Sequence, residues 1–211
     1  MLVDFSALCA GGSATVSGIY GFTIQSFKNM ATIRFLLCFI FLATAFKPAV
    51  PDRHLLRQSN HNVRQKILGI ATAEVGVKET GHSNRGIRVE EYLRYVSLKG
   101  GQPWCAAYVS WVFGQAGFAK PRSGWSPDLF PSSRLARSAL PANLIGIYFP
   151  ELKRIAHVGI VVRQDGDWIV SVEGNTNDNG SRDGDGVYIK RRHARTIKQF
   201  ADWTDAEGRL P

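Results

Sequence analysis

Hydrophobic positions recur at two different spacings along the chain, helical in its first half and strand-like in its second half. From Asn62 onward, apolar residues return every three or four positions, which is the period of an amphipathic helix. Gly and Pro interrupt this pattern at intervals and divide it into separate elements. Helices are therefore expected over residues 62–75, 89–96, 105–116 and 133–140.

Beyond residue 143 the pattern changes to short runs of β-branched and aromatic residues, separated by turns rich in Gly, Asp and Asn. Helices come first and strands follow, and this order favours an α+β fold with N-terminal helices packed on an antiparallel sheet. The expected strands cover residues 144–149, 156–163, 168–173 and 187–191.

The stretch 30–45, MATIRFLLCFIFLATA, has the pattern of a secretory signal peptide. Arg34 supplies a positive n-region, residues 35–43 form a short apolar run, and the small residues ending at Ala45 resemble a cleavage site. We therefore expect export to the periplasm or the extracellular space. A short membrane anchor or a buried helix is the alternative for the same segment.

Composition narrows the class of protein. The 211 residues are 45% hydrophobic and 20% charged, so the chain has enough apolar material for a core and is not intrinsically disordered. No apolar run reaches the roughly 20 residues that span a bilayer, which excludes a polytopic membrane protein. The formal net charge of +9 suits an anionic envelope polymer in an exported protein. No nucleic-acid-binding module is recognisable, so a nucleic-acid partner is not expected.

Removal of the signal peptide would leave Cys105 as the only cysteine, because Cys9 and Cys38 lie upstream of the cleavage site. Pro103 and the two alanines after Cys105 place the thiol in the first turn of a helix. Unpaired N–H groups and the positive end of the macrodipole stabilise a thiolate there. Since the thiolate is the reactive form, Cys105 is a candidate nucleophile. A buried structural cysteine is the alternative.

A base for this thiol is expected from His157, because among the five histidines only this one begins an apolar strand. The turn at residues 164–167 folds that strand back into a hairpin. Folding symmetrically about the turn places Gly174 opposite His157 and makes Glu173 and Asn175 its diagonal neighbours. Either side chain can orient the imidazole through a hydrogen bond. A solvated edge carboxylate is the alternative for Glu173, and a histidine with only a structural role is the alternative for His157.

Three segments in this order, PWCAAYVSW, AHVGIVV and VEGNT, resemble the CHAP domain (cysteine- and histidine-dependent amidohydrolase/peptidase). CHAP domains belong to the papain-like superfamily of bacterial cell-wall hydrolases, and the resemblance covers roughly residues 62–203. It implies helices packed on an antiparallel sheet and hydrolysis of amide bonds in peptidoglycan. The family's nucleophile, base and orienting acid map onto Cys105, His157 and Glu173, with Asn175 as an auxiliary polar partner.

The implied reaction passes through a thioester. Cys105 attacks the amide carbon, His157 protonates the leaving amine, and water then hydrolyses the thioester. The oxyanion would lie near the Cys105 backbone N–H. Gln102 is a candidate second donor to it, and Trp104 is a candidate wall of the substrate groove.

The leading expectation is an exported peptidoglycan hydrolase, either an N-acetylmuramoyl-L-alanine amidase or an endopeptidase of the stem or cross-bridge. A catalytically silent wall-binding module and an acyl-transferring relative are the alternatives, and the bond cut stays open because no wall-binding module is recognisable. We expect a monomer without a cofactor. A calcium site is not expected, because the calcium-like run from Asn175 has Gly186 where a loop of this kind carries Glu. No other metal is expected. The loop at residues 78–84 and the basic run at residues 190–195 are expected to be solvated.

The expected organisation of the chain follows from these segments. It comprises an upstream extension, the signal peptide, a linker, the CHAP-like domain and a C-terminal tail, over residues 1–29, 30–45, 46–61, 62–203 and 204–211 respectively.

Overall fold

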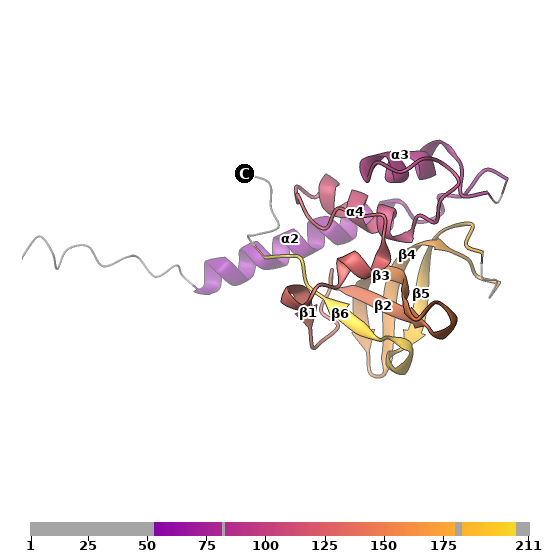
Figure 1. Cartoon of the computed structure of the whole chain (residues 1–211). Helices are drawn as coiled ribbons and strands as arrows, with labels where there is room; N and C mark the ends of the chain where they lie inside the picture. The colour runs from indigo at the N-terminus through magenta and orange to yellow at the C-terminus, as the bar shows by residue number, and fades with distance from the viewer. Residues whose placement is uncertain (1–52, 82, 180–182, 206–211) are drawn as a thin grey trace, which may run out of the picture. The chain divides into compact units, whose positions relative to one another are not determined.

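A layer of helices lies over one β-sheet in the described part of the chain (Figure 1). The computed structural model describes residues 53–81, 83–179 and 183–205. Within them the α-helices are α2 (Arg53–Ala73), α3 (Ile87–Tyr95) and α4 (Cys105–Gln115). The upstream extension, the signal peptide and residues 206–211 of the tail lie outside the described residues. Within the described ranges, no helix combines the length and hydropathy that a bilayer crossing requires.

The sheet is antiparallel, with strand order β1-β6-β2-β3-β4-β5. Helices packed against an antiparallel sheet confirm the expected α+β class. All four expected strands are present, and β2 has the expected bounds. The strands are β1 (Leu135–Ala136), β2 (Leu144–Phe149), β3 (Arg154–Asp165), β4 (Trp168–Thr176), β5 (Gly186–His193) and β6 (Gln199–Ala201).

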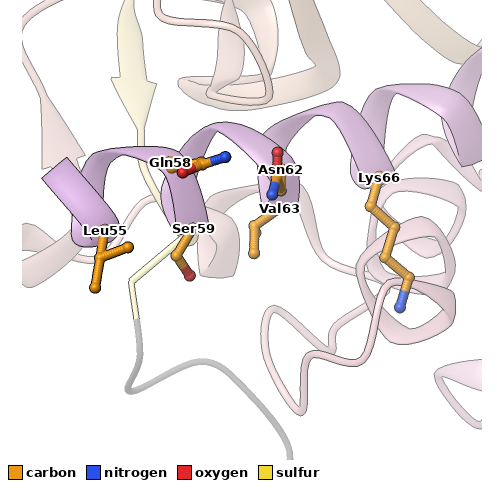
Figure 2. A pocket seen from close by; sticks show the side chains of 6 residues that line it. All are labelled: Leu55, Gln58, Ser59, Asn62, Val63 and Lys66. Carbon is orange, nitrogen blue, oxygen red and sulfur yellow. The ribbon is translucent and has the colours of Figure 1, made fainter.

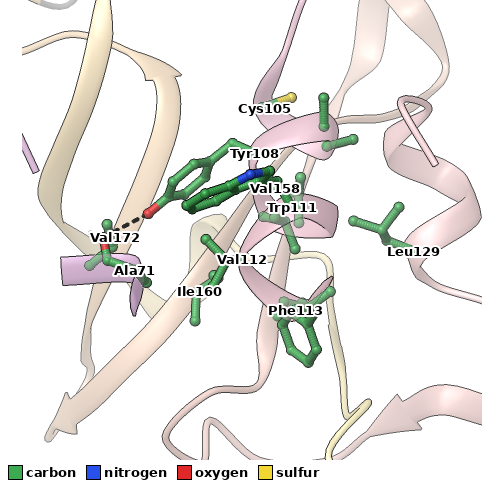
Figure 3. Packing of buried hydrophobic residues seen from close by; sticks show 14 of the residues in the cluster. Ala71, Cys105, Tyr108, Trp111, Val112, Phe113, Leu129, Val158, Ile160 and Val172 are labelled. Carbon is green, nitrogen blue, oxygen red and sulfur yellow. Dashed lines mark hydrogen bonds between the residues drawn. The ribbon is translucent and has the colours of Figure 1, made fainter. Parts of the chain in front are cut away.

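Helix α4 is the centre of the core. Residues 105–113 are all buried, and the helix contacts α2 and α3 as well as β3 and β4. The Tyr108 hydroxyl donates to the Ala71 carbonyl of α2 over 2.9 Å, and Figure 3 shows α4 packed beside Val158, Ile160 and Val172 of the sheet. Because apolar packing fixes α4 on all these sides, the start of the helix is held relative to β3 and β4.

Two expectations about secondary structure are wrong. Helix α2 begins at Arg53 rather than Asn62, so much of the expected linker is helical. Residues 54–59 are exposed, and an exposed turn carries no apolar period from which a helix can be predicted. The expected helix at residues 133–140 is instead a 3₁₀ turn followed by strand β1, whose Leu135 pairs with Ala201 from the end of the chain.

The hairpin of β3 and β4 has a register one residue away from the symmetric one. Asp165 pairs with Trp168, so the turn is centred on residues 166–167. An irregularity between Val161 and Arg163 then shifts the pairing, and Ile160 faces Val172. A bulge of this kind inserts one residue in one strand, which the sequence alone does not reveal.

Candidate active site

Cys105 is the first residue of α4, and its side chain lies at the end of the helix that Figure 3 shows beside the packed core. The residue is only 5% exposed. Its Sγ lies 3.4 Å from the Ser126 hydroxyl oxygen and 3.9 Å from the Ala156 carbonyl oxygen of β3. The thiol thus lies at the start of a helix, as the position of Pro103 and the alanines predicts, and the structure places this helix start against β3.

His157 and Glu173 are in direct contact. His157 Nε2 lies 2.7 Å from Glu173 Oε2, and the N–H donates to the carboxylate. This contact leaves Nδ1 as the ring nitrogen available to the thiol. The hairpin therefore brings together the two side chains that its geometry predicts as neighbours, despite the shifted register.

Glu173 is fully buried, and two further residues bond its carboxylate. Arg192 of β5 donates from Nε to Oε1 over 2.6 Å and from Nη2 to Oε2 over 2.5 Å. The Ser171 hydroxyl donates to Oε1 over 2.6 Å. Two parallel bonds from one guanidinium are the strong form of this ion pair. The buried negative charge therefore has several partners rather than one.

The contacts shift the ionisation of all three groups. Burial opposes ionisation of the thiol, but the hydrogen bond and charge of His157 outweigh it, so the pKa of Cys105 is lowered from its ordinary value. Burial also disfavours the imidazolium, yet hydrogen bonds with Cys105 and Glu173 raise the pKa of His157 to about 9. Burial alone would raise the pKa of Glu173, but Arg192 and His157 hold it well below its usual range. These directions favour a thiolate beside an imidazolium at neutral pH.

Gly159 makes room for the glutamate. Continuing the observed register from Ile160 and Val172 places Gly159 opposite Glu173. A Cβ built on Gly159 would lie 2.6 Å from Glu173 Cγ, which is closer than side-chain atoms approach. The Glu173 side chain therefore passes over Gly159, which has no side chain, to reach His157.

Among the described residues no hydrogen bond joins Asn175 to His157, although its expected role as an auxiliary polar partner would favour one. Its Oδ1 accepts the backbone N–H of Trp104 over 3.1 Å, and its Nδ2 donates to Asn84 over 3.0 Å and to Glu79 over 3.2 Å. The residue has a φ of 54°, a left-handed conformation that Asn tolerates better than most residues. That conformation carries it away from the strand pattern, and Asn175 instead ties the end of β4 to the segment before Cys105.

The expectation that Trp104 lines the groove is also wrong. The residue is 0% exposed, and its indole N–H donates to Glu79 Oε1 over 2.8 Å. Its ring packs against Tyr92 and Tyr108. An apolar residue at a helix start is as easily buried as exposed, and the sequence does not distinguish the two. Gln102 is exposed beside the thiol, and its role as an oxyanion donor stays a prediction.

Two regions expected to be solvated contribute to the site. Arg192 of the basic run pairs with Glu173 instead of facing solvent, and Glu79 and Asn84 of the loop at residues 78–84 line a hollow beside Cys105. Arg192 lies on the face of β5 that adjoins Glu173, but the two residues are 19 positions apart in sequence. Side chains alternate along β5, so Arg192 shares a face with Tyr188, the residue that pairs with Glu173. This signal can be used only when β5 is known to pair with β4.

Two hollows meet at the thiol, and four residues line both of them: Pro103, Cys105, Arg154 and Ala156. We call them the histidine hollow, of about 410 Å³, and the arginine hollow, of about 470 Å³. The histidine hollow is lined among others by Glu79, Asn84, Phe149, His157 and Asn175. The arginine hollow is lined among others by Leu98, Gln102, Arg122, Trp125, Ser126 and Arg154.

A separate hollow of about 440 Å³ runs along α2 and contains none of these side chains (Figure 2). It is lined by Leu55, Gln58, Ser59, Asn62, Val63 and Lys66, all from one helix. Among the described residues, no group of three or more His, Cys, Asp or Glu side chains is arranged to hold a metal ion.

No protein-family model matches the chain, and no curated protein matches it either. The resemblance to the CHAP domain therefore rests on the three segments and on the chemistry of the residues that they contain.

Proposed function

We propose that this chain is an exported cysteine amidohydrolase of the CHAP type that cleaves amide bonds in peptidoglycan. One observation carries the proposal: the buried Glu173 bonds His157 over 2.7 Å, and His157 in turn lowers the pKa of Cys105 at the start of α4. A binding module has no use for a thiol activated in this way. Cys105 is the nucleophile, His157 the acid and base, and Glu173 the group that orients the imidazole.

The first half of the proposed reaction forms a thioester. The Cys105 thiolate attacks the carbonyl carbon of the amide, and the C–N bond breaks as the protonated His157 gives its Nδ1 proton to the leaving amine. The negative charge on the carbonyl oxygen develops near the backbone N–H of Cys105, which has no partner within the helix because it lies in the first turn.

The second half of the proposed reaction regenerates the free enzyme. His157, now neutral, takes a proton from a water molecule whose oxygen attacks the thioester carbon. The C–S bond breaks, the carboxylic acid leaves, and Cys105 and His157 return to the ion pair. Throughout, Glu173 keeps the same imidazole nitrogen bonded, so the other nitrogen faces the reacting atoms at each step.

Arg192 and Ser171 support this arrangement without touching the thiol. A buried carboxyl group without partners takes up a proton and then no longer stabilises an imidazolium. The bidentate bond from Arg192 and the bond from Ser171 keep Glu173 ionised despite its burial. We therefore regard Arg192 as a positioning residue for the proposed reaction.

The choice of peptidoglycan as substrate is supported by two features of the sequence. The segments around Cys105, His157 and Glu173 resemble those of cell-wall hydrolases, and residues 30–45 have the pattern of a signal for export. The net charge of +9 adds attraction to anionic wall polymers.

Mass spectrometry of purified peptidoglycan after incubation with the full-length protein tests the proposal. New stem-peptide N-termini indicate an endopeptidase, whereas peptides released from the lactyl group indicate an amidase. Products that carry a new amide bond to an added amine indicate the acyl-transferring alternative. Cys105→Ala is the matched negative control. Wall binding without any product from the unmodified protein would contradict the proposed function and favour the binding module.

A further inference from the structure

The arginine hollow carries two cationic side chains in the same hollow as the thiol. Arg122 and Arg154 line it together with Cys105, and no Asp or Glu is among its lining residues. Its volume of about 470 Å³ is that of a small ligand site. A hollow with only positive charges favours an anion over a neutral or cationic group.

Neither arginine is neutralised by a carboxylate within the described ranges. Arg122 Nε donates to the Tyr95 carbonyl over 3.1 Å, and Arg154 Nη1 donates to the Ile155 carbonyl over 3.1 Å. Both bonds go to neutral backbone oxygens, so neither bond offsets the positive charge of the guanidinium group. A guanidinium has five N–H donors, and each of these two arginines therefore retains donors for a further partner.

The position of Arg154 is fixed by stacking. Its guanidinium carbon lies 3.9 Å from the centroid of the Trp125 ring, which is 49% exposed. Arg122 stacks in the same way over Tyr95, at 4.6 Å. Stacking holds the plane of a guanidinium while leaving its edges available, and such a planar fork matches the two oxygens of a carboxylate.

We propose that the arginine hollow is a substrate subsite that binds a free carboxylate close to the scissile amide. This inference rests on the proposed function and specifies its substrate class: anionic peptides, in which the amide cut by Cys105 has a carboxylate within reach of Arg122 and Arg154. Peptidoglycan stem peptides offer two sources of this group, the α-carboxylate of a γ-linked glutamate and the carboxylate of the terminal residue.

The test uses muropeptides in which one of these two carboxylates at a time is converted to the carboxamide. With the full-length protein, amidation of the bound carboxylate is expected to lower kcat/KM about tenfold or more, mainly through KM, because charge-assisted hydrogen bonds are lost. Amidation of the other carboxylate is expected to change little, so the two arms identify the source.

The variants Arg122→Gln and Arg154→Gln are expected to lose the preference for the carboxylate while the alkylation rate of Cys105 stays unchanged. Arg154→Lys keeps the positive charge but lacks the planar guanidinium, and this variant is expected to retain part of the preference for the carboxylate. Arg163→Gln is the matched control, since this arginine lies on the same strand with its side chain 59% exposed and paired to Asp165. It is expected to retain the full preference.

Binding measured by calorimetry on the full-length Cys105→Ala protein separates the two proposals. If the unmodified protein cuts no muropeptide but Cys105→Ala binds the carboxylate form in preference to one of the two amidated forms, the subsite is supported and the proposed hydrolysis fails. If muropeptides are cut with equal kcat/KM whether amidated or not, the subsite is overturned and the hydrolysis stands. Absence of both cleavage and preferential binding would overturn both.

Discussion

Arg192 holds both carboxylate oxygens of Glu173, from the strand next to the one that carries the glutamate. The two residues form an ion pair, with the glutamate fully buried and the arginine partly buried, on the side of His157 away from the nitrogen that is available to Cys105. The imidazole of His157 is thus supported by a charge pair rather than by a lone carboxylate.

Replacing Arg192 by Gln is expected to shift the acid limb of the pH–activity profile to higher pH. Glu173 is ionised above a pKa that Arg192 holds well below the usual range, so without this cation the carboxyl takes up its proton at a higher pH as the solution is acidified. His157 then loses its charged partner. Arg191→Gln, which alters a residue stacked on Trp168, is the control. A merely structural role for Arg192 would lower activity equally at every pH.

Glu173→Gln and Asn175→Ala are expected to act differently, because Glu173 bonds His157 whereas the hydrogen bonds of Asn175 go to Trp104, Asn84 and Glu79. Loss of the carboxylate charge should lower the pKa of His157 from about 9 and reduce turnover by orders of magnitude. Asn175→Ala removes only a tie to the segment before Cys105, and about a tenfold loss, roughly 1.4 kcal/mol of barrier, is expected. Titration of His157 by NMR and digestion rates on both variants check this. An unchanged His157 pKa in Glu173→Gln, with Asn175→Ala the more damaging variant, would require the two roles to be exchanged.

Cys105 should react with iodoacetamide at pH 6, because its pKa is lowered from the ordinary value by His157. In His157→Ala the reaction should instead rise only above the pKa of an ordinary thiol, about 8.5, because burial then opposes ionisation without the opposing charge of His157. Mass spectrometry of the alkylated protein across pH measures both. A reaction of the unmodified protein that also rises only near pH 8.5 contradicts an activated thiol.

The free energy of unfolding should depend on pH in a way that reveals the charged pair of Cys105 and His157. The raised pKa of His157 contributes stability that is full below about pH 6.5, the unfolded value, and is lost as pH rises through about 9. The lowered pKa of Cys105 contributes stability above about pH 8.5 that is lost as pH falls through its folded value. Between about pH 6.5 and 8.5, wherever the folded thiol is ionised, folding moves one proton from the thiol to the imidazole. The total number of bound protons then stays the same, so the two slopes offset each other.

Cys105→Ser removes the pH dependence of stability that comes from the thiol. The dependence that comes from His157 remains, since Glu173 still favours the imidazolium. Urea unfolding should therefore show a decreasing free energy of unfolding as pH rises from about 6.5 in the variant, and a nearly level one in the unmodified protein. Identical pH dependence of the two proteins would mean that the thiol is not ionised at neutral pH.

Gly159→Ala is expected to abolish most activity while the fold is retained. The added methyl group would lie 2.6 Å from Glu173 Cγ, so the glutamate must move away from His157. Gly69→Ala is the matched control: the same change in helix α2 meets no atom within 4 Å and should leave activity intact. Digestion rates with circular dichroism distinguish loss of the site from loss of structure.

Local signals predicted part of the site, and non-local pairing determined the rest. Pro103 and the following alanines were enough to place Cys105 at a helix start, and the alternation along a hairpin was enough to bring Glu173 near His157. The contact survives a register error of one residue because Glu173 approaches diagonally over Gly159. Arg192 was not predictable, since its role depends on which strand pairs with β4. Asn175 was misassigned because its left-handed backbone departs from the strand pattern.

The tie between Asn175 and the Trp104 backbone joins residues 71 positions apart, and the Glu173–Arg192 pair needs a third strand in place. None of these contacts exists in an extended chain, in which Cys105 is an ordinary thiol and His157 an ordinary imidazole. Chemical reactivity is therefore acquired only when folding is complete. If the chain is exported unfolded, in line with the proposed function, it would therefore cross the membrane without an activated thiol.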